Sequence, residues 1–401
     1  MLDSLERVAL GNHVETACLL HDIGNPPFGH FGEAAIKNWF ADNGVDILKK
    51  AITLRGGDLG SGDPRLVKAL ADFRDFDGNP QGFRVVTRLQ WNTDQFGLNL
   101  TTTTLASFLK YTRKAGDEPA GPFSKKAGFF ITEEPIVKRV WDDFSYASPQ
   151  RFPLAYIMEA ADDLAYCISD LEDSIEKGLV HESSAFEEIH DKFLSLCNEG
   201  TGEVYAEIKM ALVALKEGKR TDGKEFSYTD FRTTLNRAIV GYVADRYIDH
   251  HVSILNGSLD TLLPTSDAPG AILEILKGYC REHVYCHESI QRTELAGYTA
   301  IRGMLDYFKP LLSISRKKFN QALDDARDED GRRLIIEPKY LSLFPEKYSK
   351  VYKNFVDDIG EDDDFHFTEW NARAHLVVDF LAGMTDDFAM TTYRTLAGMR
   401  L

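Results

Sequence analysis

Apolar residues along the chain recur mostly every three to four positions, which is the spacing of amphipathic helices. The pattern therefore predicts an all-α protein. It predicts helices over residues 14–20, 33–40, 64–73, 82–89, 103–111, 152–173, 204–215, 231–248 and 290–307. Few segments alternate apolar and polar residues, so we expect few strands, and residues 128–131 are the best short candidate.

Two stretches rich in Gly, Pro, Ser and Asp interrupt the helical pattern, at residues 113–122 and 255–270. The second stretch either separates a core from a C-terminal helical layer or forms a long surface loop. We find no internal repeat and no low-complexity tail in the sequence.

The composition is that of a globular protein, with 43% apolar and 27% charged residues. No apolar run approaches the ~20 residues that cross a bilayer, so we expect no membrane segment. The first residues lack a signal-peptide pattern, and the five scattered cysteines argue against a disulfide framework. We therefore expect a cytoplasmic protein. Its net charge of −17 repels polyanions, so a phosphate-rich ligand needs a local basic patch or a divalent cation.

The most informative stretch begins at His21 and Asp22 and ends at His30 and Glu33. An adjacent imidazole and carboxylate at a helix end can bind one divalent cation, although such a pair alone is more often a surface cap. The two prolines and the glycines that follow form a tight, preorganised loop. His30 and Glu33 lie one helical turn apart, so the carboxylate can orient the imidazole for acid/base work. The alternative is a histidine at a helix start with a capping glutamate.

A second set of polar residues lies on the predicted helix 152–173. Asp162, Tyr166 and Asp170 share one helix face, and Asp163 lies about 100° round it. Carboxylates on an otherwise apolar helix are costly to bury unless they meet a cation or a hydroxyl. Periodicity leaves this open, since the same acids can simply face solvent.

Two basic segments are candidates for binding phosphate in this acidic protein, and each can also be an ordinary loop charge. They are Lys110 with Tyr111, Thr112 and Arg113, and Lys125 with Lys126. A cluster that resembles a zinc site follows at Cys280, His283, Cys286 and His287. Because zinc sites usually gather ligands from two chain segments, we favour packed cysteines and surface histidines there.

Several blocks of the sequence resemble one known family. The run HDIGNPPFGHFGEAAI is similar to the signature of the bacterial dGTP triphosphohydrolases, a branch of the HD-domain metal phosphohydrolases. The similarity continues through FDGNPQGFR, LKYTR, KKAGFF, EAADDLAYCISDLED and GMTDDFA. The resemblance implies an HD-domain helical core, over residues 1–180, with an additional C-terminal helical region, over 181–401, that packs on the core and completes the site.

The resemblance also implies hydrolysis of dGTP to deoxyguanosine and inorganic triphosphate, by water on a Mn²⁺ or Mg²⁺ ion attacking the α-phosphorus. Carried over by position, the metal ligands are His21, Asp22 and Asp162, and the catalytic pair is His30 with Glu33. The substrate contacts are Lys110, Tyr111 and Lys126 to the triphosphate, Tyr166 to the sugar or base, and Asp170 to the 3′-hydroxyl.

The family has a further metal-ligating histidine some tens of residues before the His-Asp pair, in a motif that Asp3-Ser4-Leu5-Glu6 faintly echoes. His13 lies about two helical turns from His21, too far to share its ion. We therefore expect an N-terminally truncated chain. The family also suggests a hexamer and a single-stranded DNA effector, for which residues 316–318 and 347–353 are the basic segments.

Three alternatives to a dGTPase remain open. A broad-specificity dNTP triphosphohydrolase would keep every motif and differ in its base contacts. Another HD enzyme, such as a nucleotidase or phosphodiesterase, would share only the His-Asp pair. A non-catalytic HD scaffold that binds nucleotide would lack a complete metal site.

Overall fold

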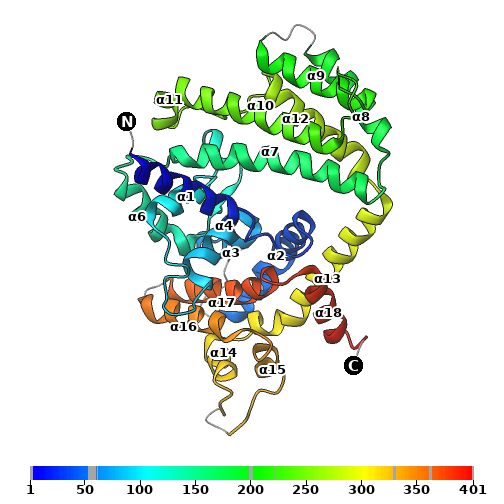
Figure 1. Cartoon of the computed structure of the whole chain (residues 1–401). Coiled ribbons are helices and arrows are strands. Elements are labelled where there is room, and N and C mark those ends of the chain that lie inside the picture. The colour runs from blue at the N-terminus through cyan, green and yellow to red at the C-terminus, as the bar shows by residue number, and fades with distance from the viewer. Residues whose placement is uncertain are drawn as a thin grey trace. The chain divides into compact units, whose positions relative to one another are not determined.

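The computed structural model describes residues 3–52, 60, 62–197, 202–220, 222–327, 331–360 and 364–399. Over these ranges the chain forms helices α1 to α18 and one two-stranded sheet (Figure 1), which confirms the all-α prediction. Among the described residues, no helix is long and apolar enough to cross a membrane.

The chain divides into two compact units, and both are discontinuous in sequence. The first unit comprises residues 1–18, 106–110 and 150–292, and the second comprises 19–105, 111–149 and 293–401. The predicted division into a core over residues 1–180 and a C-terminal helical region over 181–401 stays a prediction.

The first unit is built around α7 (Pro153–Glu176), a long helix with one apolar face. Helices α10 (Tyr228–Asp249) and α12 (Ala268–Tyr279) pack on α7, while α8 (Glu182–Leu196) and α9 (Glu203–Glu217) pack on each other (Figure 1). The short helix α11 (His251–Leu255) and the five-residue π-helix Cys280–Val284 complete this layer. The stretch 255–270 is thus a connection inside one unit, between α11 and α12.

Helix α1 (Ser4–Leu20) begins in the first unit with a reciprocal cap. The backbone N–H of Asp3 donates to Glu6 Oε2 at 2.8 Å, and the N–H of Glu6 donates to Asp3 Oδ1 at 2.8 Å. Acidic side chains in this arrangement satisfy N–H groups that a helix start leaves unpaired. The Asp3-Ser4-Leu5-Glu6 segment therefore has a local structural explanation as a helix cap.

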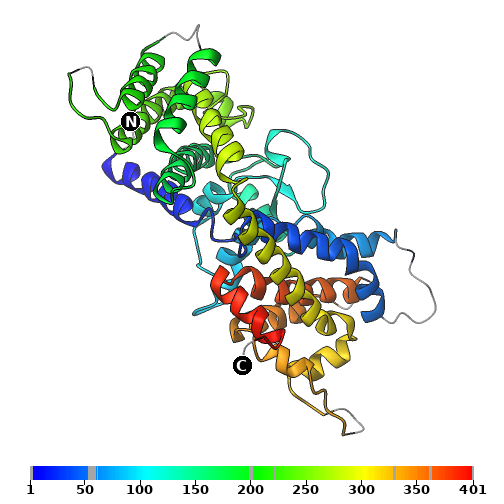
Figure 2. The ribbon, with the colours of Figure 1, turned by 90° about the vertical axis from the view of Figure 1, so that its right-hand side faces the viewer.

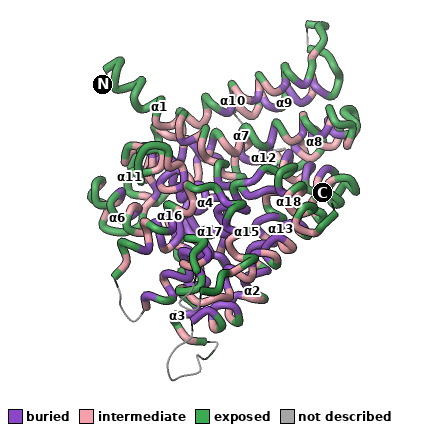
Figure 3. Tube along the Cα trace, turned by 90° about the horizontal axis from the view of Figure 1, so that it is seen from below, coloured by how far each residue is buried: buried purple, intermediate pink, exposed green. Residues whose placement is uncertain are grey.

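The second unit surrounds α17 (Phe365–Ala382), which is buried along almost its whole length (Figure 3). Helices α2 (His30–Ala51), α3 (Pro64–Arg74), α14 (Arg316–Leu323) and α16 (Glu346–Asp358) pack against it, and α13 (Glu288–Ser313) adds apolar side chains to the same core (Figure 2). Its charged side chains form ion pairs inside the core: Arg373 with Glu369, His375 with Asp72, and Asp379 with Arg84.

The remaining elements of the second unit are short. They are α4 (Gly78–Arg84), the π-helix Val85–Leu89, α6 (Glu134–Asp143), α15 (Glu337–Leu341), α18 (Asp386–Leu396) and the 3₁₀ turns Pro122–Ser124 and Ile131–Glu133. Helix α5 (Thr102–Phe108) begins in the second unit and ends in the first.

The predicted elements differ from the observed ones mainly at their ends. The predicted helix 33–40 lies in the first half of α2, and the predicted helix 103–111 ends at Phe108. The predicted strand 128–131 is β2 (Ala127–Phe129), which pairs in parallel with β1 (Arg113–Lys114). The break predicted at 113–122 therefore begins with the strand β1. The amide of Ala115, which follows β1, also donates to the carbonyl of Phe129 at 2.9 Å.

Candidate active site

His21 and Asp22 lie in the turn that directly follows α1. Their side chains converge, with His21 Nε2 and Asp22 Oδ2 3.3 Å apart. Ligand atoms bonded to one metal ion at about 2.0–2.2 Å lie about 3 Å apart, so this pair fits two neighbouring positions on a divalent cation. The mixed nitrogen and oxygen donors also suit ions of the Mn²⁺ type.

The loop after this pair is fixed by close backbone packing. A Cβ atom on Gly24 would lie 2.0 Å from the nitrogen of Gly82 and 2.2 Å from the carbonyl oxygen of Gly78, so only glycine fits here. Phe28 adopts a positive φ of 63°, and its backbone N–H donates to Asp386 Oδ1 at 2.9 Å. The loop is therefore attached to α4 and to the start of α18.

His30 and Glu33 form the expected contact on the first turn of α2. His30 Nδ1 lies 3.0 Å from Glu33 Oε2, and Glu33 Oε1 accepts from the backbone N–H of Gly78 at 2.7 Å. Glu33 is buried, whereas the side chain of His30 is 82% exposed. The hydrogen bond with Glu33 raises the pKa of His30, although burial and the charge of Lys126 act against it. The arrangement gives an oriented imidazole with an accessible face.

Tyr111 lies shortly before β1 in the sequence, and Lys126 lies directly before β2. Lys126 Nζ is 2.9 Å from Asp77 Oδ2, and the Tyr111 ring, which is buried, lies beneath Lys125 Nζ at 5.8 Å. Burial alone would lower the pKa of Lys126, but the Asp77 carboxylate outweighs it and the pKa lies above its ordinary value. Lys126 is therefore a permanent cation at neutral pH.

In the first unit, the acidic face of α7 meets partners on other segments. Lys110 Nζ lies 2.9 Å from Asp162 Oδ2, and Lys277 Nζ lies 2.9 Å from Asp163 Oδ1. The backbone carbonyl of Lys110 accepts two hydrogen bonds from Arg151, at 3.1 and 2.8 Å. Asp162 therefore meets a cation, which was one of the two arrangements that periodicity left open.

Tyr285 contacts the acidic face of α7, and sequence reasoning missed it. Its hydroxyl donates to Asp170 Oδ2 and lies 2.7 Å from the hydroxyl of Tyr166. Burial and the hydrogen bond to Asp170 raise the pKa of Tyr285 well above its ordinary value. Tyr285 follows a π-helix and lies 115 residues from Asp170, so no local pattern marks it. Asp170 thus already accepts an O–H group.

The predicted site residues divide between the two units. The first unit contains Lys110, Asp162, Tyr166 and Asp170. The second unit contains His21, Asp22, His30, Glu33, Tyr111 and Lys126. Within each unit the contacts described above bring them together in small groups, and the roles assigned to them stay predictions.

In the described part of the chain, no three of Cys280, His283, Cys286 and His287 bring their ligand atoms within 4.8 Å of one another. Cys280 is buried, while the Cys286 thiol donates to the Glu282 carbonyl. Ligand atoms of Glu188, Glu282 and His283 do lie within 4.8 Å of one another. However, Lys192 Nζ contacts Glu188 at 2.8 Å and Glu282 at 2.9 Å, so an ammonium group already bridges the two carboxylates. We interpret this cluster as a surface ion-pair network.

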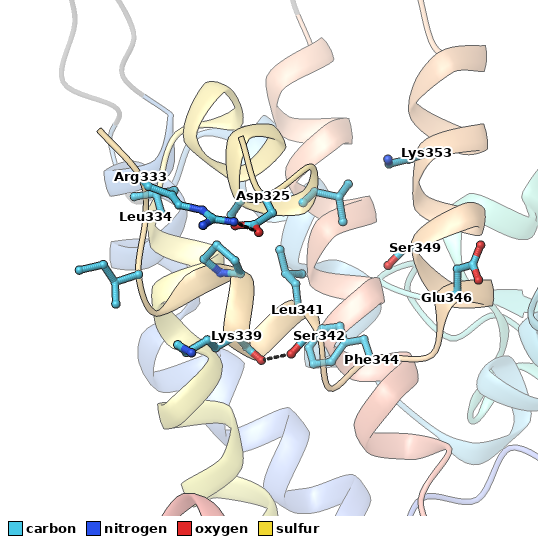
Figure 4. A pocket seen from close by; sticks show the side chains of 14 residues that line it. Asp325, Arg333, Leu334, Lys339, Leu341, Ser342, Phe344, Glu346, Ser349 and Lys353 are labelled. Atoms are coloured by element: carbon cyan, nitrogen blue, oxygen red, sulfur yellow. Dashed lines mark hydrogen bonds and ion pairs between the residues drawn. The ribbon is translucent and has the colours of Figure 1, made fainter. Parts of the chain in front are cut away.

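The second unit also contains an open cavity of about 730 Å³ between α14, α15 and α16 (Figure 4). Arg333 and Asp325 form an ion pair beside it, and the hydroxyl of Ser342 donates to the carbonyl of Lys339. None of the predicted site residues lines this cavity.

Comparisons with known proteins agree with the motifs. Residues 4–72 match the HD domain model. The chain is 34% identical over 413 residues to a probable deoxyguanosinetriphosphate triphosphohydrolase of Pseudomonas aeruginosa, covering 99% of this chain and 80% of the relative. It is 34% identical over 408 residues to the deoxyguanosinetriphosphate triphosphohydrolase of Salmonella paratyphi A, covering 96% of this chain and 77% of the relative. The protein of that name from Enterobacter sp. strain 638 is 33% identical over 409 residues, covering 96% of this chain and 78% of the relative.

Proposed function

Because the chain belongs to the deoxyguanosinetriphosphate triphosphohydrolase family of HD-domain proteins, we propose that it hydrolyses dGTP to deoxyguanosine and inorganic triphosphate. The observation that carries the chemistry is the exposed His30 imidazole, fixed through Nδ1 by the buried Glu33. The carboxylate is in turn fixed by the N–H of Gly78. Such a relay is what a general acid/base requires.

His30 acts as the acid in this proposal. Breaking the bond between the α-phosphorus and the 5′ oxygen leaves an alkoxide, which is a poor leaving group unless it receives a proton. Because Glu33 raises the pKa of His30, the imidazole keeps its proton to higher pH than an isolated histidine. A positioned acid of this kind typically contributes ~10²–10⁴-fold to the rate.

The triphosphate is bound by cations that the protein holds in place. Lys126 is oriented by Asp77, and Lys110 by its contact with Asp162 and by the hydrogen bonds that Arg151 donates to its carbonyl. Tyr111 adds a hydroxyl beside these lysines in the sequence. Ammonium groups form strong hydrogen bonds with phosphate oxygens.

His21, Asp22 and Asp162 would hold the divalent ion, Mn²⁺ or Mg²⁺. The 3.3 Å approach of His21 to Asp22 supports this assignment. When bound, such an ion polarises phosphate and lowers the pKa of coordinated water. The two carboxylates and the imidazole supply donors of the type that these ions accept.

Asp170 would accept from the 3′-hydroxyl of the sugar, next to Tyr166. In support, Asp170 Oδ2 accepts a hydrogen bond from the phenol of Tyr285, as it would from a sugar hydroxyl. The half-exposed Tyr166 offers a ring on which a sugar or base can pack.

A broad-specificity dNTP triphosphohydrolase is the alternative, because no residue assigned above distinguishes guanine from the other bases. We further propose a cytoplasmic homo-oligomer, with the hexamer of the family as the expected form. Exposed apolar side chains along α10 and α11 (Val240, Ile248, Val252 and Leu255) support self-association. A single-stranded DNA effector stays a prediction.

The test is release of inorganic triphosphate from each of the four dNTPs with Mn²⁺ or Mg²⁺. We expect release from dGTP, and a loss of at least ~10²-fold in His30→Ala and Asp162→Ala. Matched controls are His283→Ala, in the surface ion-pair network, and Asp173→Ala, an exposed acid on α7. Equal release from all four dNTPs would favour the broad-specificity enzyme. No release from any of them, with nucleotide still bound in equilibrium dialysis, would leave the non-catalytic scaffold.

A further inference from the structure

The turn at the start of α4 contacts two functional groups of the second unit at once. The backbone N–H of Gly78 donates to Glu33, the partner of His30, at 2.7 Å. The side chain of the preceding Asp77 contacts Lys126 Nζ at 2.9 Å. Two consecutive residues therefore connect the acid/base pair to the phosphate-binding lysine.

Asp77 is held in place independently of Lys126. It is 3% exposed, and its Oδ1 accepts from the backbone N–H of Asn79 at 3.1 Å and from Asn79 Nδ2 at 2.6 Å. The side chain is thus the N-cap of α4, and Oδ2 remains for the lysine. Its direction is set by the helix start rather than by the cation.

The same turn is packed against the loop that follows His21 and Asp22. A Cβ atom on Gly78 would lie 2.1 Å from Asn25 Oδ1, so the backbone of Gly78 packs directly against the Asn25 side chain. The turn that begins α4 therefore contacts the loop as well as Glu33.

We propose that Asp77 is a positioning residue, which places the Lys126 ammonium beside the His30 imidazole so that both act on one triphosphate. The proposal rests on the proposed function, because it takes Lys126 as a phosphate ligand and His30 as the acid. Asp77 itself acts through these two residues and contacts no substrate.

The charges around His30 explain why a lysine here needs a carboxylate. Glu33 on α2, Asp77 at α4 and Lys126 before β2 all influence the imidazole: the two acids raise the pKa of His30 and the lysine lowers it. Burial opposes ionisation of Asp77, but Lys126 and the hydrogen bonds from Asn79 hold the pKa of Asp77 below its ordinary value. Asp77 therefore stays charged and offsets the effect of Lys126 on the acid.

The test is Asp77→Asn in the full chain, with kcat and KM for dGTP measured across pH. Loss of a charged hydrogen bond to Lys126 should raise KM by about 10- to 100-fold. The alkaline limb of the kcat/KM profile should move to lower pH, because the charge of Asp77 no longer offsets the effect of Lys126 on the pKa of His30. Asp77→Glu should restore part of both properties.

Asp63→Asn is the matched control. Asp63 caps α3 by accepting from the N–H of Arg65 at 2.9 Å and forms an ion pair with the same arginine at 2.8 Å, so it loses equivalent contacts. Asp63 has no part in the proposed site, and Asp63→Asn should keep the KM and the pH profile of the parent. In a Lys126→Met background, Asp77→Asn should raise KM no further, because its effect passes through the lysine.

The proposal is overturned if Asp77→Asn matches Asp63→Asn in KM and pH profile, or if the two changes at Asp77 and Lys126 raise KM independently. Titration of His30 by NMR, with inorganic triphosphate as the added probe, needs no turnover. A parent chain that releases no triphosphate would defeat the proposed function. An unchanged His30 titration in Asp77→Asn would then defeat the positioning role separately.

Discussion

Arg151→Met should destabilise the first unit strongly, because it removes the cation from a buried ion pair. Arg151 is 1% exposed, and its guanidinium donates to both carboxylate oxygens of Glu159 and twice to the carbonyl of Lys110. Without the arginine, the Glu159 carboxylate loses its cation in a largely buried position. The Lys110 carbonyl also loses both of these donors.

The size of the effect follows from that burial. Breaking a buried pair by removing one partner costs about 3–5 kcal/mol. In a domain of 150–250 residues, 1 kcal/mol lowers the melting temperature by about 2–4 °C, so the change should lower it by about 6–20 °C. Arg281→Met is the control in the same unit. Its contact with Glu274 is 3.7 Å and exposed, and exposed pairs contribute about 0–1 kcal/mol.

A double-mutant cycle measured by denaturant unfolding tests this reasoning. Glu159→Leu alone should also lower the free energy of unfolding strongly, since it leaves a buried guanidinium without its carboxylate. The double variant Arg151→Met, Glu159→Leu should recover most of the stability, because an apolar pair of similar volume can replace a buried ion pair. Strictly additive losses, or an Arg151→Met variant as stable as Arg281→Met, would refute the argument from burial.

Three further predictions test other contacts. Gly24→Ala should lower the free energy of unfolding by more than the ~1–3 kcal/mol typical of overpacking, because the new methyl group meets backbone atoms of α4. Gly11→Ala is the control in chemical unfolding, because a methyl group there meets nothing within 4 Å. Equal stability of the two variants would contradict this prediction. Glu33→Gln should lower the pKa of His30 and so move the alkaline limb of kcat/KM to lower pH, and an unmoved limb would mean that His30 is not the titrating acid. Asp170→Asn should raise KM for dGTP by about 10- to 100-fold and leave KM for 2′,3′-dideoxy-GTP unchanged, whereas equal effects on both would exclude a 3′-hydroxyl contact.

Local spacing predicted the contacts that depend on one helix. His30 and Glu33 are one turn apart, and the predicted approach of carboxylate to imidazole is present at 3.0 Å. The acids of α7 share a face, as their four-residue spacing requires. Such predictions succeed because helix geometry alone fixes them.

Contacts between distant segments could not be predicted in this way. Tyr285 reaches Asp170 across 115 residues, and its position depends on a π-helix that no periodicity indicates. Helix α17 was missed for a related reason. It is buried on all sides, so its polar residues, such as His375 paired with Asp72 across 303 residues, do not mark a solvent face.

The acidic charge of the chain, −17, makes the pairing of its candidate phosphate ligands informative. Lys126 and Lys110 each contact a carboxylate, so neither pair adds much net positive charge. Such pairs instead hold the lysine side chain in one orientation. A lysine side chain carries about 2 kcal/mol of rotamer entropy, and a lysine already oriented by Asp77 loses less of it when phosphate binds. On the proposed function, attraction of a polyanion would depend on preorganised ammonium groups, and on the cation that His21, Asp22 and Asp162 are proposed to hold, rather than on surface charge.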